Sequence, residues 1–405
     1  MATLELAPPS GAKAPAGASS NDRIPALDGL RGIAILAVML FHFKLYAFGE
    51  AGTLAERIYS TVLGLGWAGV DLFFVLSGFL ITGILYDSRG QPSYYRVFYA
   101  RRTVRIFPLY YAALAALFFA IPHGLKLLER ERAMLDLLEH ATPWFSWVYL
   151  LNWPMGVYGF ATVPGIMQHL WSLSVEEQFY LVWPGVVRNL PRRRLMVLCA
   201  GLVTGAVALR ILCHLLDRPE GAYLWTFCRT DSLGIGALIA LAMRGPADRL
   251  TLERYARPVA MAAAAGLAGV VVWAGTTATG GFWMDTLGIL LLATLSGGCL
   301  ALCLGSPGSN LLAKAMSSPF LRFFGRYSYG LYICHQPVLV ALTKSGAVSD
   351  RWAGVFHGKI PAMMAINALG LLLASGAALA SWHLLEKHFL KLKDRPMFQY
   401  SPLNG

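Results

Sequence analysis

The stretch DGLRGIAILAVMLFHFKLY, residues 28–46, is long and apolar enough to cross a membrane as a helix, yet it contains an arginine and a histidine. Ionisable side chains are costly inside a membrane and usually serve a function there. Arg31 and His42 lie about 20° apart around an ideal helix and roughly 16 Å apart along its axis. One face of this predicted helix therefore carries a charge near one membrane surface and an imidazole well inside.

The composition places the whole chain in the same class as this stretch. Of its 405 residues, 56% are hydrophobic and 14% are charged, and the mean hydropathy is +0.54. Apolar runs of about 20 residues then predict an all-α integral membrane protein with about ten transmembrane helices. The predicted spans cover residues 29–48, 62–86, 105–122, 170–187, 195–216, 229–244, 258–276, 284–304, 324–343 and 360–385.

Arginine residues predict the orientation of these spans, because they gather in alternate loops. They occur in the segments 89–102, 188–194 and 244–257. By the positive-inside rule these loops are cytoplasmic, which also predicts that both termini are cytoplasmic in a multi-pass protein of the plasma (inner) membrane. The net charge of +12 is therefore a topology signal, and it gives no reason to expect nucleic-acid binding.

The chain is predicted to consist of one membrane domain between two tails. Residues 1–22, rich in Ala, Pro, Gly and Ser, are expected to be a disordered cytoplasmic tail with no signal peptide. Residues 23–390 form the membrane domain, and 391–405 a cytoplasmic C-terminal tail. The six cysteines lack paired metal-ligand spacing and are interpreted as small core residues, and no metal is expected. The longest outward connection, about 123–169, is aromatic-rich and favours either a membrane-interface belt or a sugar-binding lid.

Several long motifs occur in a fixed order along the chain. They are IPALDGLRGIAILAVMLFHF (24–43), GWAGVDLFFVLSGFLIT (66–82), FYARRTVRIFPLYY (98–111), HLWSLSVEEQFYLVWP (169–184) and FGRYSYGLYICHQPV (324–338). Through these motifs the chain resembles the acyltransferase-3 family of membrane-bound O-acyltransferases over roughly residues 24–390. The resemblance implies transfer of an acyl group, most often acetyl, from a cytoplasmic donor such as acetyl-CoA to a hydroxyl of a cell-envelope or exported carbohydrate, including lipid-linked glycans.

The family pattern of an arginine and a histidine separated by ten residues falls on Arg31 and His42. An imidazole can take a proton from a hydroxyl near neutral pH, so His42 is the predicted general base, with an acyl-histidine intermediate as the variant. A second pattern, two arginines separated by three residues, falls on Arg101 and Arg105. Guanidinium groups there could hold the phosphates of coenzyme A together with Arg31.

A third pattern falls on Ser172, Glu176 and Tyr180, whose spacing of four places them on one helical stripe. The glutamate could orient the histidine or bind acceptor hydroxyls, and the tyrosine could donate to a developing oxyanion. Glu177 lies about 100° around the helix from Glu176. The supporting candidates are Asp28, Asp71, Ser172 and His335, and Asp71 could pair with an arginine across helices.

Two other functions remain open from the residues alone. A secondary transporter could use Arg31, His42 and Glu176 as a proton and substrate pathway, although no internal repeat supports it. Within the family, the acceptor could instead be a small secreted metabolite. The predicted partners are acyl-CoA, a carbohydrate or lipid-linked glycan acceptor and membrane lipid, and the sequence gives no oligomeric state.

Overall fold

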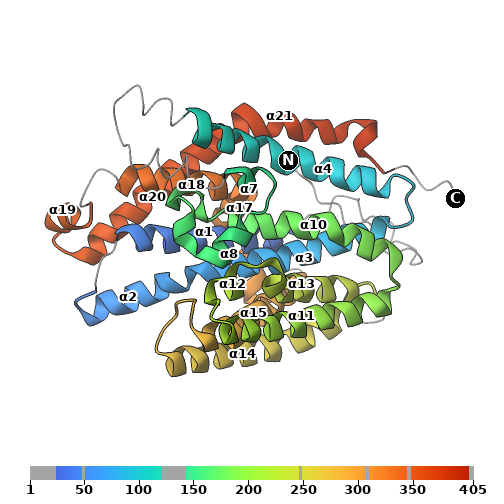
Figure 1. Ribbon diagram of the computed structural model, residues 1–405, viewed down its shortest axis with the longest axis horizontal. Helices are drawn as coiled ribbons and strands as arrows, with labels where there is room; N and C mark the ends of the chain where they lie inside the picture. The colour runs from blue at the N-terminus through green and yellow to red at the C-terminus, as the bar shows by residue number, and fades with distance from the viewer. Residues whose placement is uncertain are drawn as a thin grey trace.

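The stretch that carries Arg31 and His42 forms α1, Pro25–Ala47, which begins at a proline, the residue that suits the first helical position. The computed structural model describes residues 24–47, 51–120, 143–245, 249–305, 310–343 and 348–400, and these ranges form helices and turns without strands. The long helices pack side by side along one axis (Figure 1). The predicted all-α membrane fold is confirmed.

Seven helical segments in the described ranges are long and apolar enough to cross a membrane. They are Pro25–Lys44, Leu54–Ser88, Tyr94–Ala120, Arg192–Leu215, Thr251–Ala274, Met284–Leu304 and Lys359–Asp394. The other three predicted spans correspond to α10 (Trp171–Asn189), α13 (Thr230–Ala242) and α18 (Ser328–Thr343). These three helices are shorter or more polar than the seven. The protein is thus a multi-pass membrane protein, and the count of ten stays a prediction.

The centre of the bundle is formed by helices that approach each other through small residues. α3 (Gly69–Ser88) packs on α13, and a Cβ added at Gly78 would lie 2.0 Å from the carbonyl oxygen of Leu233. α1 packs on α17 (Pro319–Arg326), where a Cβ at Gly325 would lie 1.7 Å from the carbonyl oxygen of Asp28. Only glycine allows such close backbone contact, which is how helices in membranes gain dispersion energy.

The remaining helices surround this centre. α14 (Arg249–Ala274) pairs with α15 (Ile289–Leu304), α18 with α20 (Lys359–Ser381), and α11 (Arg192–Leu215) with α13. α2 (Leu54–Gly64) leads through a 3-10 turn, Leu65–Ala68, into α3. Near the chain's end α21 (Lys387–Leu390) and two 3-10 turns, Lys391–Asp394 and Pro396–Phe398, contact α4.

Two expectations about individual segments need correction or restriction. α4 covers Tyr94–Ala115, not residues from 105 onward, so Arg101 lies two turns inside a helix. Residues 123–142 of the predicted outward connection lie outside the described residues, as do the whole predicted N-terminal tail, 1–22, and residues 401–405 of the C-terminal tail. The rest of that connection forms the short helices α7 (Pro143–Trp147), α8 (Asn152–Tyr158) and α9 (Gly165–Gln168). The hydroxyl of Tyr110 holds α7 to α4 by donating to the Ser146 carbonyl at 2.7 Å.

Candidate functional site

A cavity lies between α1, α3, α4, α10 and α18, and most residues selected by the sequence patterns line it. Its polar wall consists of Arg31, Ser77, Arg102, Arg105, Ser172, Glu176, Tyr180, Ser328, Tyr329 and Tyr332. Ser172, Glu176 and Tyr180 lie together on one side, as their spacing of four along α10 predicts. Glu177 is not among the lining residues, so of the two neighbouring glutamates only Glu176 faces the cavity.

The cavity carries an excess of positive charge. Three guanidinium groups, those of Arg31, Arg102 and Arg105, share its wall with one carboxylate, that of Glu176. Like charges held this close repel one another in an apolar surrounding, and a bound anion relieves that repulsion. Planar guanidinium groups also match phosphate oxygens in two-point hydrogen bonds. The arrangement therefore suits a phosphorylated ligand.

Glu176 is held in place by a short chain of hydroxyl groups. The Ser77 hydroxyl donates to Glu176 Oε1 at 2.5 Å, and the Tyr180 hydroxyl lies 3.1 Å from the Ser77 oxygen. Since the one Ser77 hydrogen points to the carboxylate, Tyr180 must be the donor in the second bond. The Arg102 guanidinium stacks over the Tyr180 ring at 5.2 Å. The carboxylate, the tyrosine and the guanidinium thus form one rigid corner of the cavity.

A second cavity adjoins the first and shares four of its residues, Arg31, Arg105, Ser328 and Tyr329. Its further lining includes Asp28, Arg326, Trp382 and Glu386. The predicted supporting residue Asp28 therefore lies beside Arg31 at this cavity. Because Arg31 and Arg105 stand between the two cavities, one extended ligand could contact both while its charged group stays at the arginines.

Three histidines form a cluster farther along α1. The rings of His42 and His335 have centroids 5.0 Å apart, and His335 and His169 are separated by the same distance. His42 is half-buried, whereas His335 and His169 are 0% and 4% exposed. The structure thus joins α1, α18 and the segment before α10, which are far apart in sequence, at one group of imidazoles.

Carbonyl groups determine which nitrogens of two of these histidines carry hydrogen. His335 Nδ1 lies 2.7 Å from the Tyr332 carbonyl oxygen, and His42 Nδ1 lies 2.9 Å from that of Val38. A carbonyl only accepts, so both Nδ1 atoms are protonated in the neutral rings. His335 Nε2, which lies 3.3 Å from His42 Nδ1, then faces it with a lone pair. The Nε2 atom of His42 consequently has a free lone pair with which to accept a proton.

Tyr332 connects the histidine cluster to the cavity. Its side chain lines the cavity, its hydroxyl donates to the His169 carbonyl oxygen, and its ring lies 5.7 Å from that of His335. Ser172 completes the connection, because its hydroxyl lies 2.7 Å from the Tyr332 oxygen and must be the donor there. His42 itself does not line the cavity.

Arg101 lies apart from both cavities. Its Nε atom donates to the carbonyl oxygen of Phe398 at 2.6 Å, and its guanidinium carbon lies 5.6 Å from the centre of the Tyr400 ring. The residue predicted as a phosphate ligand thus holds the C-terminal segment against α4. Arg102, which no sequence pattern separated from ordinary topology charge, takes the place beside Arg105 in the wall.

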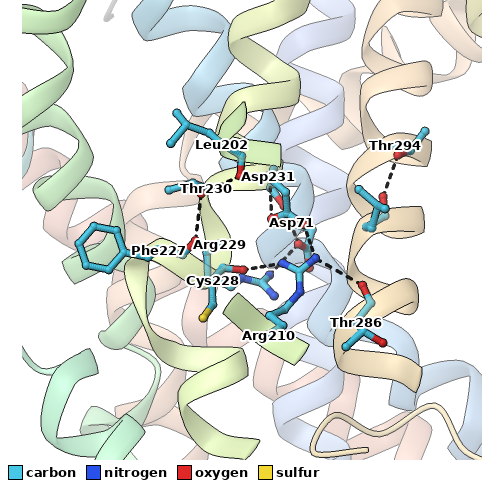
Figure 2. Close-up of polar contacts among 12 residues, drawn as sticks. Asp71, Leu202, Arg210, Phe227, Cys228, Arg229, Thr230, Asp231, Thr286 and Thr294 are labelled. Atoms are coloured by element: carbon cyan, nitrogen blue, oxygen red, sulfur yellow. Dashed lines mark hydrogen bonds and ion pairs between the residues drawn. The ribbon is translucent and has the colours of Figure 1, made fainter. Parts of the chain in front are cut away.

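Asp71 lies in a separate buried network, where it forms the cross-helix pair that the sequence predicts. Its Oδ1 atom accepts from Arg229 at 2.6 Å and from Ser232 at 2.8 Å, and Arg210 pairs with Asp231 at 2.7 Å (Figure 2). All four charged side chains are fully buried. Arg229 also lies 5.6 Å from the centre of the Phe74 ring, which lines the cavity. The network therefore contacts the cavity wall through Arg229 and Phe74 and helps to hold that wall in place.

Sequence reasoning missed three residues of the site, Ser77, Arg102 and His169. Ser77 and His169 belong to the family-like segments 66–82 and 169–184, and a polar residue within an apolar run was the available signal. Among the described residues, no group of three or more His, Cys, Asp or Glu side chains is arranged to hold a metal ion.

Comparison with known proteins gives one family and several relatives. Residues 24–384 match the family model described as an acyltransferase domain. The chain is 30% identical over 345 residues to the peptidoglycan O-acetyltransferase OatA of Listeria monocytogenes, covering 80% of this chain and 50% of that protein. It is 27% identical over 341 residues to the O-acetyltransferase OatA of Staphylococcus aureus, covering 78% and 51%. The chain thus spans about half the length of these relatives. No solved structure matches it.

Proposed function

Since this chain belongs to the acyltransferase-domain family, we propose that it transfers an acetyl group from acetyl-CoA on the cytoplasmic side to a hydroxyl of an envelope carbohydrate of the plasma membrane. The observation that carries this proposal is the cavity with three arginines, joined through Tyr332 to the His42–His335 pair. Such a transfer requires a site for the donor's phosphates and, one donor arm away, an imidazole with a lone pair that can accept a proton.

The donor's phosphates are assigned to Arg31, Arg102 and Arg105. Coenzyme A carries a diphosphate and a 3′-phosphate, and each charge-assisted bond to a guanidinium contributes about 1.5–3 kcal/mol. With the phosphates at the arginines, the pantetheine arm extends along α1. The axial rise of roughly 16 Å from Arg31 to His42 is comparable with the length of that arm. Arg101 contributes indirectly, by holding the C-terminal segment beside Arg102 and Arg105.

The transfer step uses His42 as the general base. Its Nε2 accepts the proton of the acceptor hydroxyl while the hydroxyl oxygen attacks the thioester carbonyl carbon. The carbon–sulfur bond then breaks, and the proton passes from His42 to the departing thiolate, which leaves as coenzyme A. His335 acts as a positioning residue. Its Nε2 lone pair accepts a hydrogen bond from His42 Nδ1–H and stabilises the imidazolium that forms. Glu176 and Tyr180, which share one corner of the cavity with Arg102, are assigned to the wall that positions the donor.

The acceptor is proposed from the names of the relatives. Listeria OatA is named as a peptidoglycan O-acetyltransferase, which favours an amino-sugar glycan as the acceptor.

Donor binding and transfer can be tested separately in purified protein. Acetyl-CoA affinity is measured by calorimetry in detergent, and acetyl transfer is measured with β-1,4-linked N-acetylhexosamine oligosaccharides and by release of free coenzyme A thiol. His42→Ala should keep the wild-type affinity but lose release and transfer by about 10²- to 10⁴-fold, the usual effect of removing a general base. His383→Ala, which removes an exposed histidine, is the control. Wild-type rates in His42→Ala would remove His42 from the mechanism, and a folded wild type that does not bind acetyl-CoA would exclude that donor.

A further inference from the structure

Two cysteines meet at the end of the bundle opposite the arginine-rich loops. Cys213 lies in the final turn of α11, which starts at the basic segment Arg192–Arg194, and Cys228 lies in the 3-10 turn Thr226–Arg229. Their sulfur atoms are 3.8 Å apart, and the residues are 5% and 2% exposed. By the positive-inside rule this end of α11 is extracytoplasmic. Disulfides persist in that compartment, whereas the cytosol keeps thiols reduced.

Backbone hydrogen bonds fix the two segments that carry these cysteines. The Cys228 amide donates to the Trp225 carbonyl oxygen at 3.0 Å, and the Cys213 carbonyl oxygen accepts from the Arg218 amide at 2.8 Å. With Ala222 and Trp225 the two cysteines form a small apolar cluster of their own. Because a disulfide bond is about 2.05 Å long, the two sulfur atoms need to approach by less than about 2 Å to form one.

We propose that Cys213 and Cys228 form a disulfide bond in the mature membrane protein. The two thiols give up two protons and two electrons to the disulfide of an extracytoplasmic thiol–disulfide oxidant, which leaves as a dithiol. The bond forms as the segment between the cysteines folds, before both sulfur atoms are buried. It closes a loop that contains α12 (Pro219–Leu224) against the end of α11.

This bond would fix a segment on which the buried charge network depends. The Cys228 carbonyl oxygen accepts from Arg210 Nη1 at 2.5 Å, and Figure 2 shows this oxygen directed toward Arg210 while the sulfur points away. The next residue, Arg229, pairs with Asp71 and lies against the cavity-lining Phe74. A disulfide bond at Cys228 therefore limits the movement of Arg229 against Phe74, although neither cysteine lines the cavity.

The test counts free thiols in the full-length protein purified from membranes without reductant. Free thiols are blocked with N-ethylmaleimide in denaturant at mildly acidic pH, then disulfides are reduced and the released thiols are labelled with a PEG-maleimide. We expect two of the six cysteines to be labelled only after reduction, and mass spectrometry of the unreduced digest to contain the peptide pair joined through Cys213 and Cys228. Cys213→Ser and Cys228→Ser should each abolish the pair, whereas Cys299→Ser, in α15, should leave it intact.

Thermal unfolding distinguishes a disulfide that stabilises the fold from one formed by chance oxidation. Dithiothreitol should lower the unfolding temperature of wild type and of Cys299→Ser, but not that of Cys213→Ser, which lacks the bond from the start. Six thiols alkylated in wild type before reduction, or a disulfide between any other pair, would overturn the proposal.

Discussion

His335 Nε2 lies 3.3 Å from His42 Nδ1, although the two residues are 293 positions apart in the chain. His335 is fully buried and its other ring nitrogen faces the carbonyl oxygens of Leu331 and Tyr332. The pair resembles an oriented base in which the second group is an imidazole in place of a carboxylate. This relationship makes the contribution of His335 measurable apart from that of His42.

Replacement of His335 should lower turnover without changing donor affinity. In His335→Ala the His42 Nδ1–H loses an acceptor, so we expect kcat to fall by roughly 10²-fold while KM for acetyl-CoA stays within about twofold of wild type. His335→Gln should recover part of kcat, because its side-chain oxygen can accept at nearly the same position. Equal kcat in the Ala and Gln variants, both shown to be folded, would mean that His335 only fills space.

Donor affinity should depend on Arg105 far more than on arginines outside the cavity. Arg105→Ala removes a guanidinium from both cavities, so the Kd for acetyl-CoA should rise about 10- to 100-fold, as expected for one or two charge-assisted hydrogen bonds. Arg31→Ala should behave alike. The measurement is calorimetry at two salt concentrations.

Arg193→Ala and Arg101→Ala are the matched comparisons for this series. Arg193 is exposed in the basic segment and should have no effect on the Kd. Arg101 contacts Phe398 and Tyr400, so its loss should raise the Kd less than the loss of Arg105 does. A larger effect at Arg101 than at Arg105 would contradict the assignment of the phosphates to the cavity.

Adjacent glutamates should differ in their effect on turnover. Glu176 accepts a hydrogen bond from Ser77 inside the cavity, whereas Glu177 lines neither cavity and its Oε1 atom has no hydrogen-bond partner among the described residues. Glu176→Gln should therefore lower kcat/KM by at least about tenfold, and Glu177→Gln should change it by less than about threefold. Initial rates of thiol release measure both. Comparable losses in the two variants would show that the charge of the pair matters more than which residue lines the cavity.

Sequence alone gave the parts of the site that lie on one helix. The spacing of Ser172, Glu176 and Tyr180 fixes their common stripe whatever packs against it, because helical geometry is local. The same reasoning could not choose between Arg101 and Arg102. Both lie about one turn from Arg105, and only the packing of α4 against α1, α10 and the C-terminal segment decides which one faces the cavity.

Contacts between segments that are distant in the chain could not be predicted from the sequence. His42 and His335 come from α1 and α18, and nothing in either spacing specifies that these helices meet at this height. The cysteines show the same limit, since Cys213 and Cys228 lack a recognised pairing motif and come together only because η4 (Thr226–Arg229) folds back on α11. By contrast, the pairing of Asp71 with an arginine was predictable, because an isolated charge inside a membrane protein is too costly.

The buried ion pairs should affect stability through the charge that a single substitution leaves behind. Arg229→Met removes the partner of Asp71 in a fully buried site, so it should destabilise the fold by about 3–5 kcal/mol. The double variant Asp71→Asn with Arg229→Met removes both charges of this pair, leaves the Arg210–Asp231 pair in place and should recover much of that loss.

Arg244 and Asp87 supply the control for these variants, because they form an ion pair at 2.5 Å whose side chains remain 11% and 16% exposed. This pair is bidentate but remains within reach of water, so Arg244→Met should shift the unfolding temperature less than Arg229→Met does. The shifts are measured by thermal unfolding in detergent, with size-exclusion profiles to verify the fold. If the double variant is as unstable as Arg229→Met, the charge of Arg229 is not what stabilises this region. The stabilisation then comes from packing of its long side chain against Phe74, Trp171 and Tyr223.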